Sequence, residues 1–226
     1  MSHRLVIAID GPSGAGKSTA GRALAARLGY TFLDTGAMYR ALGLKALRRS
    51  LPLDDPHSLT ELARVTRIEL TDGGRGVRLD GEDVTSLIRT QEVSSAASRL
   101  SVHSGVRREM VARQREVGQG GGVVLDGRDI GTTVFPAADV KFYMDAAPKR
   151  RVERRAKELV RAGAALDEEA VERQIEERDR LDMTRADSPL TRASDAVYLD
   201  TTDLTPEEVL QRMLQVVASR QAAAEG

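Results

Sequence analysis

The sequence contains no cysteine and no asparagine among its 226 residues. Without cysteine the chain cannot form disulfides, a zinc finger or a thiol nucleophile, and this composition suits a reducing compartment. No apolar run approaches the ~20 residues that span a bilayer. The run Leu5–Ile9 is too short for a secretion signal and ends in a glycine-rich turn. We therefore expect a cytoplasmic protein that has no membrane partner.

An excess of one charge is also missing, because acidic and basic residues balance at 34 each. A balanced chain does not attract nucleic acid as a whole, so we expect no nucleic-acid partner, and we expect a monomer. Arginine nevertheless accounts for 29 of the 34 basic residues. Coding bias alone would explain that number. Alternatively, some arginines bind phosphates, for which the planar guanidinium is better suited than an ammonium.

Short apolar segments alternate with helical segments along most of the chain. Leu5–Ile9 is continuously apolar and rich in β-branched residues, which is typical of a strand buried on both faces of a parallel sheet. The alternation predicts an α/β fold in which helices cover a mostly parallel sheet in three layers. Further strands are expected at Tyr30–Leu33, Val123–Leu125, Val140–Met144 and Ala196–Leu199, and helices at Ser18–Leu28, Gly36–Ser50, 91–117, 148–185 and after a capping box that begins at Thr205.

A different pattern interrupts this alternation after Pro52–Pro56. Three short segments between residues 68 and 85 have a period of two and are separated by Asp72-Gly73-Gly74 and Asp80-Gly81, which are hairpin signals. We expect a small antiparallel β insert here, and a helical lid in the arginine-rich region after Pro148, with Gly163 between its two helices. The single domain would divide into a core (1–53, 90–147 and 188–226), an insert (about 54–89) and a lid (about 148–187).

The most specific motif is Gly-Pro-Ser-Gly-Ala-Gly-Lys-Ser, which matches G-x-x-x-x-G-K-[ST] between an expected strand and an expected helix. Its glycines let several backbone N–H groups turn inward beside the positive end of a helix. Lys17 can then reach the β- and γ-phosphates, and the Ser18 hydroxyl can bind Mg²⁺. The predicted ATP-binding residues are Gly11, Pro12, Ser13, Gly14, Ala15, Gly16, Lys17, Ser18 and Thr19.

Other classes of phosphate-loop protein lack support in the sequence. GTPases need an Asn-Lys-x-Asp motif to read the base, and this chain has no asparagine. The Leu-Ser-Gly-Gly-Gln signature of transport ATPases is absent as well. A small kinase that transfers a phosphoryl group to a small acceptor remains the best interpretation.

A first candidate for the acceptor site follows the second expected strand. Thr35 can cap the helix that opens at Gly36, and Tyr39 and Arg40 then lie in its first turn, which makes an anion site plausible. The alternative is simple capping beside a solvated arginine.

A second candidate follows the strand Val123–Leu125, at the edge where open α/β sheets bind ligands. Asp126 can join the water shell of Mg²⁺, orient the acceptor or cap a turn. Arg128, next to Asp129, can contact a transferring phosphoryl group.

A third candidate comprises Arg178, Asp182 and Arg185, which follow one another at helical spacing. Upstream, Arg154 and Arg155 belong to a further arginine cluster in the expected lid. Nearby glutamates could neutralise many of these as weak surface pairs. Alternatively, lid arginines stabilise the charge of the transition state and exclude water.

Together these motifs resemble the bacterial cytidylate kinase family. The resemblance rests on Gly-Pro-Ser-Gly-Ala-Gly-Lys-Ser-Thr, Leu-Asp-Thr-Gly-Ala-Met-Tyr-Arg, Asp-Gly-Arg-Asp-Ile-Gly-Thr-Thr-Val-Phe-Pro and the Arg-Asp…Asp…Arg…Ser-Pro-Leu segment, and it runs from about residue 4 to the last helix. It implies a nucleoside-monophosphate kinase with ATP as donor, Mg²⁺ as cofactor, CMP or dCMP as preferred acceptors, and UMP as a poorer one.

The resemblance also implies roles for individual residues. Lys17, Arg128, Arg178 and Arg185 would be catalytic, with Arg185 facing the transferred phosphoryl group. The other residues would bind the three parts of the acceptor nucleotide. Its phosphate would contact Thr35, Tyr39, Arg40 and Arg128. Its cytosine would contact Ser98, Arg107 and Asp129, and its pentose would contact Asp182 and Arg178. The resemblance leaves two roles open for Asp126, namely a place in the Mg²⁺ shell or a contact with the acceptor.

Two alternatives remain. One is another small P-loop kinase with a UMP, AMP, dTMP or shikimate acceptor. Adenylate kinases usually have Asp-Gly-[Phe/Tyr]-Pro-Arg where this chain has Asp-Gly-Arg-Asp, and shikimate kinases are shorter and lack the antiparallel insert. The other is a switch that holds ATP without transferring its phosphate, although a switch has no use for a second anion site.

Overall fold

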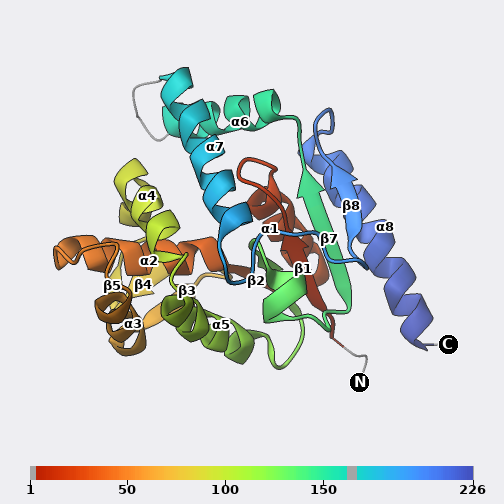
Figure 1. Cartoon of the computed structure of the whole chain (residues 1–226). Helices are drawn as coiled ribbons and strands as arrows, with labels where there is room; N and C mark the ends of the chain where they lie inside the picture. Colours follow the sequence, from red (N-terminus) through yellow and green to blue (C-terminus); the bar gives the residue numbers. More distant parts are fainter. Residues whose placement is uncertain (1–3, 162–166, 226) are drawn as a thin grey trace.

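The computed structural model describes residues 4–161 and 167–225, and a parallel sheet lies at its centre. Within these described residues the sheet has five strands in the order β2-β6-β1-β7-β8, and each neighbouring pair is parallel. The strands are β1 (Val6–Asp10), β2 (Thr31–Asp34), β6 (Val123–Asp126), β7 (Val140–Asp145) and β8 (Val197–Asp200). The prediction of an α/β fold with a mostly parallel sheet is therefore confirmed (Figure 1).

Helices cover both faces of this sheet because its strands are apolar on both faces. In β1, Ile7 and Ile9 pack into a cluster with α1 and α8, whereas Ala8 packs on the opposite face in a cluster that includes α2, α3 and α5. This arrangement is the predicted three-layer core. The helices are α1 (Lys17–Leu28), α2 (Thr35–Arg48), α3 (Pro56–Val65), α4 (Gln91–Leu100), α5 (Ser104–Gly118), α6 (Pro148–Arg161), α7 (Glu168–Thr184) and α8 (Pro206–Glu225).

The predicted insert forms a small antiparallel sheet of β3 (Ile68–Thr71), β4 (Gly76–Leu79) and β5 (Glu82–Asp83). Its two turns contain Asp72 and Asp80 with positive φ values of 52° and 51°, each followed by glycine in the same region. These turns are where the Asp-Gly pairs predicted them, since Asp and Gly tolerate this conformation better than other residues.

The small sheet does not have a core of its own. Val77 and Leu79 of β4 pack with Ala41 of α2 and Val93 of α4 in one buried cluster. In addition, Lys45 Nζ of α2 lies 2.6 Å from Asp80 Oδ2. The packing unit around the insert therefore includes α2 and α4, although the range 54–89 contains neither helix.

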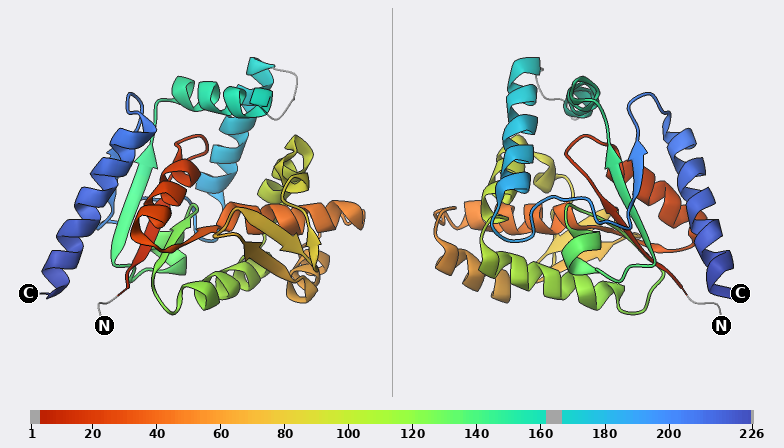
Figure 2. Two further views of the ribbon diagram at one scale, coloured as in Figure 1. Left: turned by 180° about the vertical axis from the view of Figure 1, so that it is seen from behind. Right: turned by 45° about the vertical axis from the view of Figure 1, so that its right-hand side comes forward.

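Helices α6 and α7 carry the arginine-rich sequence, and they lie together beyond the carboxyl end of β7 (Figures 1 and 2). Gly163, which the sequence placed between them, lies outside the described residues. Asp167 caps α7 by accepting a hydrogen bond from Ala170 N at 3.0 Å. The helix ends at Thr184, so Arg185 has extended backbone angles and does not continue the helical face of Arg178 and Asp182.

Two further details differ from the sequence prediction. Thr35 does not cap α2: Asp34 is the N-cap, and its Oδ1 accepts a hydrogen bond from Ala37 N at 2.8 Å. A carboxylate at this position satisfies a free N–H group and also interacts favourably with the helix dipole. The expected helix 91–117 is two helices, because His103 is extended and the Ser101 hydroxyl donates back to Ser98 O.

The final helix begins as predicted. Thr205 N and its hydroxyl donate to the Glu208 carboxylate, and Glu208 N donates to Thr205 Oγ1, which together form a capping box. In the two described ranges of the chain, no helix combines the length and apolarity needed to cross a membrane.

Candidate active site

The predicted phosphate loop, Gly11–Ser18, connects β1 to α1 and depends on its glycines. Gly11, Gly14 and Gly16 have φ values of 144°, 78° and 90°, which favour glycine. A Cβ on Gly11 would lie 1.9 Å from Met144 O, so no larger residue fits there. Because Gly16 is the N-cap of α1 and makes no side-chain cap, the loop opens directly onto the positive end of that helix.

Lys17 is buried at the start of α1, and its Nζ donates to Pro12 O at 2.7 Å. Burial, together with the neighbouring Arg128 guanidinium, lowers the pKa of Lys17 to about 7. Among the described residues Lys17 has no ion-pair partner within 4.0 Å. A bound phosphate would supply the opposite charge that this ammonium lacks.

Ser18 faces the end of the neighbouring strand. Because β1 pairs with β6 in the register Ile9 with Asp126, the carboxylate of Asp126 reaches the loop, and Ser18 Oγ donates to Asp126 Oδ2 at 2.5 Å. Burial and, to a lesser extent, the nearby Asp34 carboxylate raise the pKa of Asp126 to about 6. The strand pairing thus places the loop serine and a carboxylate side by side.

These two oxygen ligands fit Mg²⁺, which prefers hard oxygen donors and commonly takes only one or two of them from the protein. Within residues 4–161 and 167–225 no cluster of three or more His, Cys, Asp or Glu side chains could hold a metal ion alone. A magnesium ion here would complete its octahedral shell with water and substrate phosphates.

The first turn of α2 lies next to this pair. Thr35 Oγ1 donates to Asp126 O at 2.6 Å. Arg40 Nη2 lies 3.2 Å from Asp34 Oδ2, and Arg22 of α1 lies 3.3 Å from the same oxygen. Burial opposes ionisation of Asp34, but Arg40, the N–H of Ala37 and Arg22 lower its pKa overall. Asp34 therefore both caps α2 and holds the Arg40 side chain in an ion pair at the first turn of that helix.

Five charged side chains from three separate segments of the sequence alternate in sign along one buried series of contacts. Arg128 Nε donates to Asp182 Oδ2 at 2.7 Å, and Asp182 Oδ1 lies 3.5 Å from Arg185 Nη1. Arg185 Nη2 then lies 3.3 Å from Asp129 Oδ1, and Asp129 Oδ2 accepts a hydrogen bond from Arg107. We call this set of residues the ion-pair chain.

Two nitrogen donors of the ion-pair chain lack a hydrogen bond to the described residues. All five side chains are at most 14% exposed. Even so, Arg107 Nε and Arg185 Nη2 are buried without a hydrogen-bond partner in the described part of the protein. A buried N–H group without a partner is unfavourable unless a ligand satisfies it. Arg107 and Arg185 lie on either side of Asp129, and Arg185 Nη2 is the atom that faces Asp129 Oδ1 at 3.3 Å.

Tyr39 lies beside the ion-pair chain. Burial raises the pKa of Tyr39 to about 12, so its hydroxyl stays protonated and can donate a hydrogen bond. Burial opposes ionisation of Asp182, yet Arg128, Arg178 and Arg185 lower its pKa overall. The carboxylate of Asp182 is therefore ionised near neutral pH.

Arg178 differs from the arginines of the ion-pair chain, because no carboxylate of the described residues pairs with it. Burial and the adjacent Arg128 lower the pKa of Arg178 to about 10, and Arg178 makes no hydrogen bond or ion pair with the described residues. Its electrostatic neighbours include Asp182, Arg40 and Arg155. An unpaired guanidinium among other cations is a site that an anionic ligand would stabilise.

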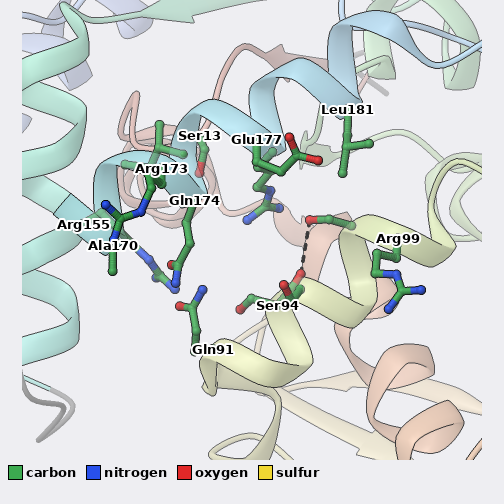
Figure 3. Close-up of a pocket in the computed structure, with 14 residues that line it drawn as sticks. Ser13, Gln91, Ser94, Arg99, Arg155, Ala170, Arg173, Gln174, Glu177 and Leu181 are labelled. Atoms are coloured by element: carbon green, nitrogen blue, oxygen red, sulfur yellow. Dashed lines mark hydrogen bonds between the residues drawn. The ribbon is translucent and has the colours of Figure 1, made fainter. Parts of the chain in front are cut away.

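A cleft of about 380 Å³ lies between α4 and α7 and reaches the phosphate loop at Ser13 (Figure 3). Ser98 and Arg178 line opposite sides of it, and Arg155 borders it from α6. Its single acidic lining residue is Glu177, whose carboxylate is already paired with Arg180. The charge of the cleft lining is therefore mainly positive, and hydroxyl, amide and apolar side chains make up the rest of the lining.

Arg154 and Arg155, both expected in the lid, have different surroundings. Arg154 donates to Thr201 Oγ1 at 2.9 Å and to Thr201 O at 2.5 Å, and its guanidinium lies over the phosphate loop near Gly16. Arg155 pairs with Glu158 at 3.0 Å on the same helix. Arg155 thus lines the cleft together with Ser98 and Arg178, whereas Arg154 lies beside the phosphate loop.

Sequence reasoning missed several residues that organise this site. Asp10 ends β1, is 4% exposed, and accepts hydrogen bonds from Ile130 N at 2.8 Å and Gly131 N at 2.7 Å. It thereby holds the turn of residues 130–134 that follows Asp129. Asp34, Arg151 and Asp179 also contact the site. A carboxylate at the end of a buried strand, directly before the glycine-rich loop, was the one available signal for Asp10.

Known sequences match the chain over nearly its whole length. The sequence profile of the family described as cytidylate kinase matches residues 7–219. A protein named cytidylate kinase from Solibacter usitatus (strain Ellin6076) is 51% identical over 219 residues, which cover 96% of this chain and 94% of that protein. Another protein of that name, from Bacillus subtilis (strain 168), is 45% identical over 222 residues, with 97% and 99% covered.

Solved structures share the fold at much lower identity. A gluconokinase from Sinorhizobium meliloti 1021 superposes with a TM-score of 0.52 at 15% identity, covering 100% of this chain and 98% of that one. A shikimate kinase from Acinetobacter baumannii, in complex with shikimate, gives a TM-score of 0.50 at 19% identity, with 96% and 95% covered. These structures show the P-loop kinase fold alone.

Proposed function

The chain belongs to the cytidylate kinase family, and we propose that it transfers the γ-phosphoryl group of ATP to CMP or dCMP. The observation that supports this acceptor best is the ion-pair chain, in which the carboxylate of Asp129 lies between Arg107 and Arg185, each of which has one buried nitrogen without a hydrogen bond to the described residues. Cytosine presents a matching set of groups, because its N4 amino group donates while its O2 and N3 accept.

The donor phosphates would bind in the phosphate loop. Its inward N–H groups and the positive end of α1 face the phosphate oxygens, and Lys17 would reach the β- and γ-phosphates. Ser18 and Asp126 would hold Mg²⁺, directly or through water, and the metal would neutralise charge on the β- and γ-oxygens. The 2.5 Å contact between Ser18 and Asp126 favours the metal shell as the role of Asp126.

The phosphate of the acceptor would lie at the first turn of α2. Arg40 points there from its pair with Asp34, and Thr35 is held against Asp126 O. Arg128 lies between this turn and the lid through its bond to Asp182. Two guanidinium groups and a helix N-terminus are a suitable set of donors for a phosphate monoester.

The base would be read by the middle of the ion-pair chain. Asp129 would accept from the cytosine N4 amino group, and Arg107 and Ser98 would donate to the remaining acceptors. The sequence expectation placed Arg185 at the transferred phosphoryl group. Because Arg185 contacts Asp129 and Asp182, we instead assign it to base recognition.

The transferred group would then face Arg128 and Arg178, both of which lie in the electrostatic neighbourhood of Lys17. Their positive charge would stabilise negative charge that spreads over the phosphoryl oxygens in the transition state. Asp182 would bind the pentose hydroxyl group with help from Arg178. These roles rest on proximity and charge, and Arg154 would contact the donor nucleotide from the opposite side of the loop.

A coupled assay of ADP release tests this function. CMP, dCMP, UMP, AMP, GMP, dTMP and shikimate are offered in turn with Mg²⁺ and ATP, and we expect CMP and dCMP to give the highest kcat/KM. An equal rate with AMP would refute the proposed acceptor. Calorimetric titration of CMP into the protein separates a kinase from a switch, because a switch without an acceptor site would show no CMP binding.

The cytoplasmic location, the monomeric state, the lack of nucleic-acid partners and the division into core, insert and lid remain predictions. Size-exclusion chromatography with light scattering tests the oligomeric state directly.

A further inference from the structure

Both lid helices hold the backbone of a single phosphate-loop residue, Ser13. Ser13 N donates to Asp179 Oδ1 of α7 at 3.0 Å, and Ser13 O accepts a hydrogen bond from Arg151 Nη1 of α6 at 3.1 Å. Arg151 and Asp179 also form an ion pair with each other. We call Arg151 and Asp179 the Ser13 clamp, because together they use both hydrogen-bonding groups on either side of this residue.

The clamp is buried, whereas the ion pairs formed within α6 or within α7 are more exposed. The Arg151 side chain is 12% exposed and that of Asp179 is 9% exposed. By comparison, the neighbouring pair of Arg180 and Glu177 is 60% and 55% exposed. Exposed pairs contribute little, whereas removing one partner of a buried pair leaves the other charge without compensation.

Arg151 also connects the clamp to the start of the lid. Its Nε donates to Ala146 O at 3.2 Å, where the chain leaves β7 for α6. The loop approaches α6 so closely that a Cβ on Gly14 would lie 2.9 Å from Arg151 O. The end of β7, the first turn of α6 and the phosphate loop are therefore packed at one point.

The position of Asp179 on α7 determines where its neighbours point. Successive residues of a helix are rotated by about 100°, and residues three apart share a face. With Asp179 attached to Ser13, Arg178 is directed into the cleft and Asp182 reaches Arg128. A rotation or shift of α7 that breaks the clamp would therefore displace both residues from the site.

We propose that Arg151 and Asp179 are positioning residues for phosphoryl transfer, which fix the lid against the phosphate loop so that Arg178 stands opposite Lys17. Neither side chain touches the reacting atoms in this scheme; each acts through the Ser13 backbone and through α7. The inference rests on the proposed function, because it assigns Arg178 to the transferred group.

Steady-state kinetics of Asp179→Asn, Arg151→Lys and the double variant test this role. A misplacement of about 1 Å in a catalytic group can lower turnover by about 10²-fold, so we expect each single variant to lose roughly 10- to 100-fold in kcat. The KM for CMP should rise by less than kcat falls, because Asp182 shifts with α7 whereas Arg107 and Asp129 lie on other elements and keep their ion pair. Since both residues act through the backbone of one residue, Ser13, the double variant should be no slower than the slower single variant.

Arg180→Gln is the matched control, because it removes the exposed pair next to Asp179 on α7 and should retain the parental kcat. Multiplicative losses in the double variant, or a rise in KM that accounts for the whole effect, would overturn the proposal. If Asp179→Asn does not fold, Arg151→Lys, which keeps the charge but loses the fork of donors, carries the same test.

A distance measurement gives a readout that does not depend on activity. The chain has no cysteine, so Arg27→Cys on α1 and Lys157→Cys on α6 place two spin labels at exposed positions without side reactions. We expect a narrow distance distribution in the parent and a broader or longer one in Asp179→Asn. An unchanged distribution would contradict the clamp.

The proposed function and the positioning role of the Ser13 clamp can be refuted independently of each other. If the parent does not phosphorylate CMP, the proposed function is wrong while the distance experiment still tests the clamp. If the parent phosphorylates CMP and the clamp variants match its kcat, the function stands and the positioning role is wrong.

Discussion

The donor and acceptor sides of the site are built in opposite ways. The phosphate loop is one continuous stretch, Gly11–Ser18, whose shape is determined by glycines with positive φ and by the helix that follows. The ion-pair chain instead collects residues from α5, the end of β6, and the end of α7. Backbone conformation determines the shape of the phosphate loop, whereas in the ion-pair chain charged side chains hold one another in place.

This difference also appears in the electrostatics. Lys17 has a backbone carbonyl as its hydrogen-bond partner, so its charge is available to a ligand. Asp129 and Asp182 are each shared between two arginines before any substrate binds. We infer that the donor side supplies charge for the reaction, while the acceptor side supplies a preorganised shape for one base. Each prediction below tests one part of this contrast.

The largest effect is expected on the donor side. Lys17→Met removes the charge that would contact the β- and γ-phosphates, and loss of such a group should lower kcat by about 10³-fold. Because the ion-pair chain is untouched, the affinity for CMP should stay within about threefold of the parent. Stopped assays of ADP release and calorimetry with CMP measure the two quantities. A comparable loss in CMP affinity would show that the two sides are not separable.

Asp126→Asn should have the next largest effect, because it weakens the proposed metal shell. We expect kcat to fall by about 10²-fold and the Mg²⁺ concentration for half-maximal activity to rise by about tenfold. Asp195→Asn is the control, since Asp195 is an exposed carboxylate that pairs with Lys141 away from the loop. If the Mg²⁺ requirement of Asp126→Asn equals that of the parent, Asp126 has no role in holding the metal.

Arg185→Gln decides between the two roles considered for this residue. As a base-reading donor, its loss should raise the KM for CMP by about 10-fold and reduce the preference for CMP over UMP. Loss of kcat at constant KM would place Arg185 at the transferred phosphoryl group instead. Because the side chain is buried between two carboxylates, thermal unfolding should also shift to lower temperature.

The smallest effect concerns pH. The pKa of Asp126 is raised from its ordinary value to about 6, so the folded protein takes up this proton as pH falls through 6. The proton competes with Mg²⁺ for the carboxylate, and at pH 6 the apparent Mg²⁺ affinity should be about twofold lower than at pH 7.5. Mg²⁺ titrations at the two pH values measure this change. Asp126→Asn should show no such dependence, and a persistent one would assign the titration to another group.

The sequence predicted the donor side well because its residues are consecutive. The motif Gly11–Ser18, its strand and its helix follow one another in the chain, so spacing alone located them. The antiparallel insert was predictable for the same reason, since Asp72 and Asp80 mark local turns. Thr35 was misjudged as the cap of α2 because Asp34, one residue earlier, provides the stronger acceptor.

The acceptor side was predictable only through the resemblance to known kinases. Nothing in the spacing of Arg107, Asp129 and Arg185 says that they meet, since 22 residues separate the first two and the third lies on another element. For the same reason the sequence left open the role of the arginine cluster that contains Arg151, and it did not single out Asp179. Their pairing depends on how α6, α7 and the phosphate loop pack, and sequence periodicity does not describe that packing.

The most direct test of the account is the ratio of kcat/KM for CMP to that for UMP, measured in the parent and in Asp129→Asn. Cytosine donates from N4 where uracil accepts at O4, so a carboxylate at Asp129 should favour CMP and an amide should not. The account predicts that the ratio falls by about tenfold or more in the variant, because one matched base contact contributes about 1–3 kcal/mol of discrimination. A ratio that stays at the parental value would show that the ion-pair chain does not read the base.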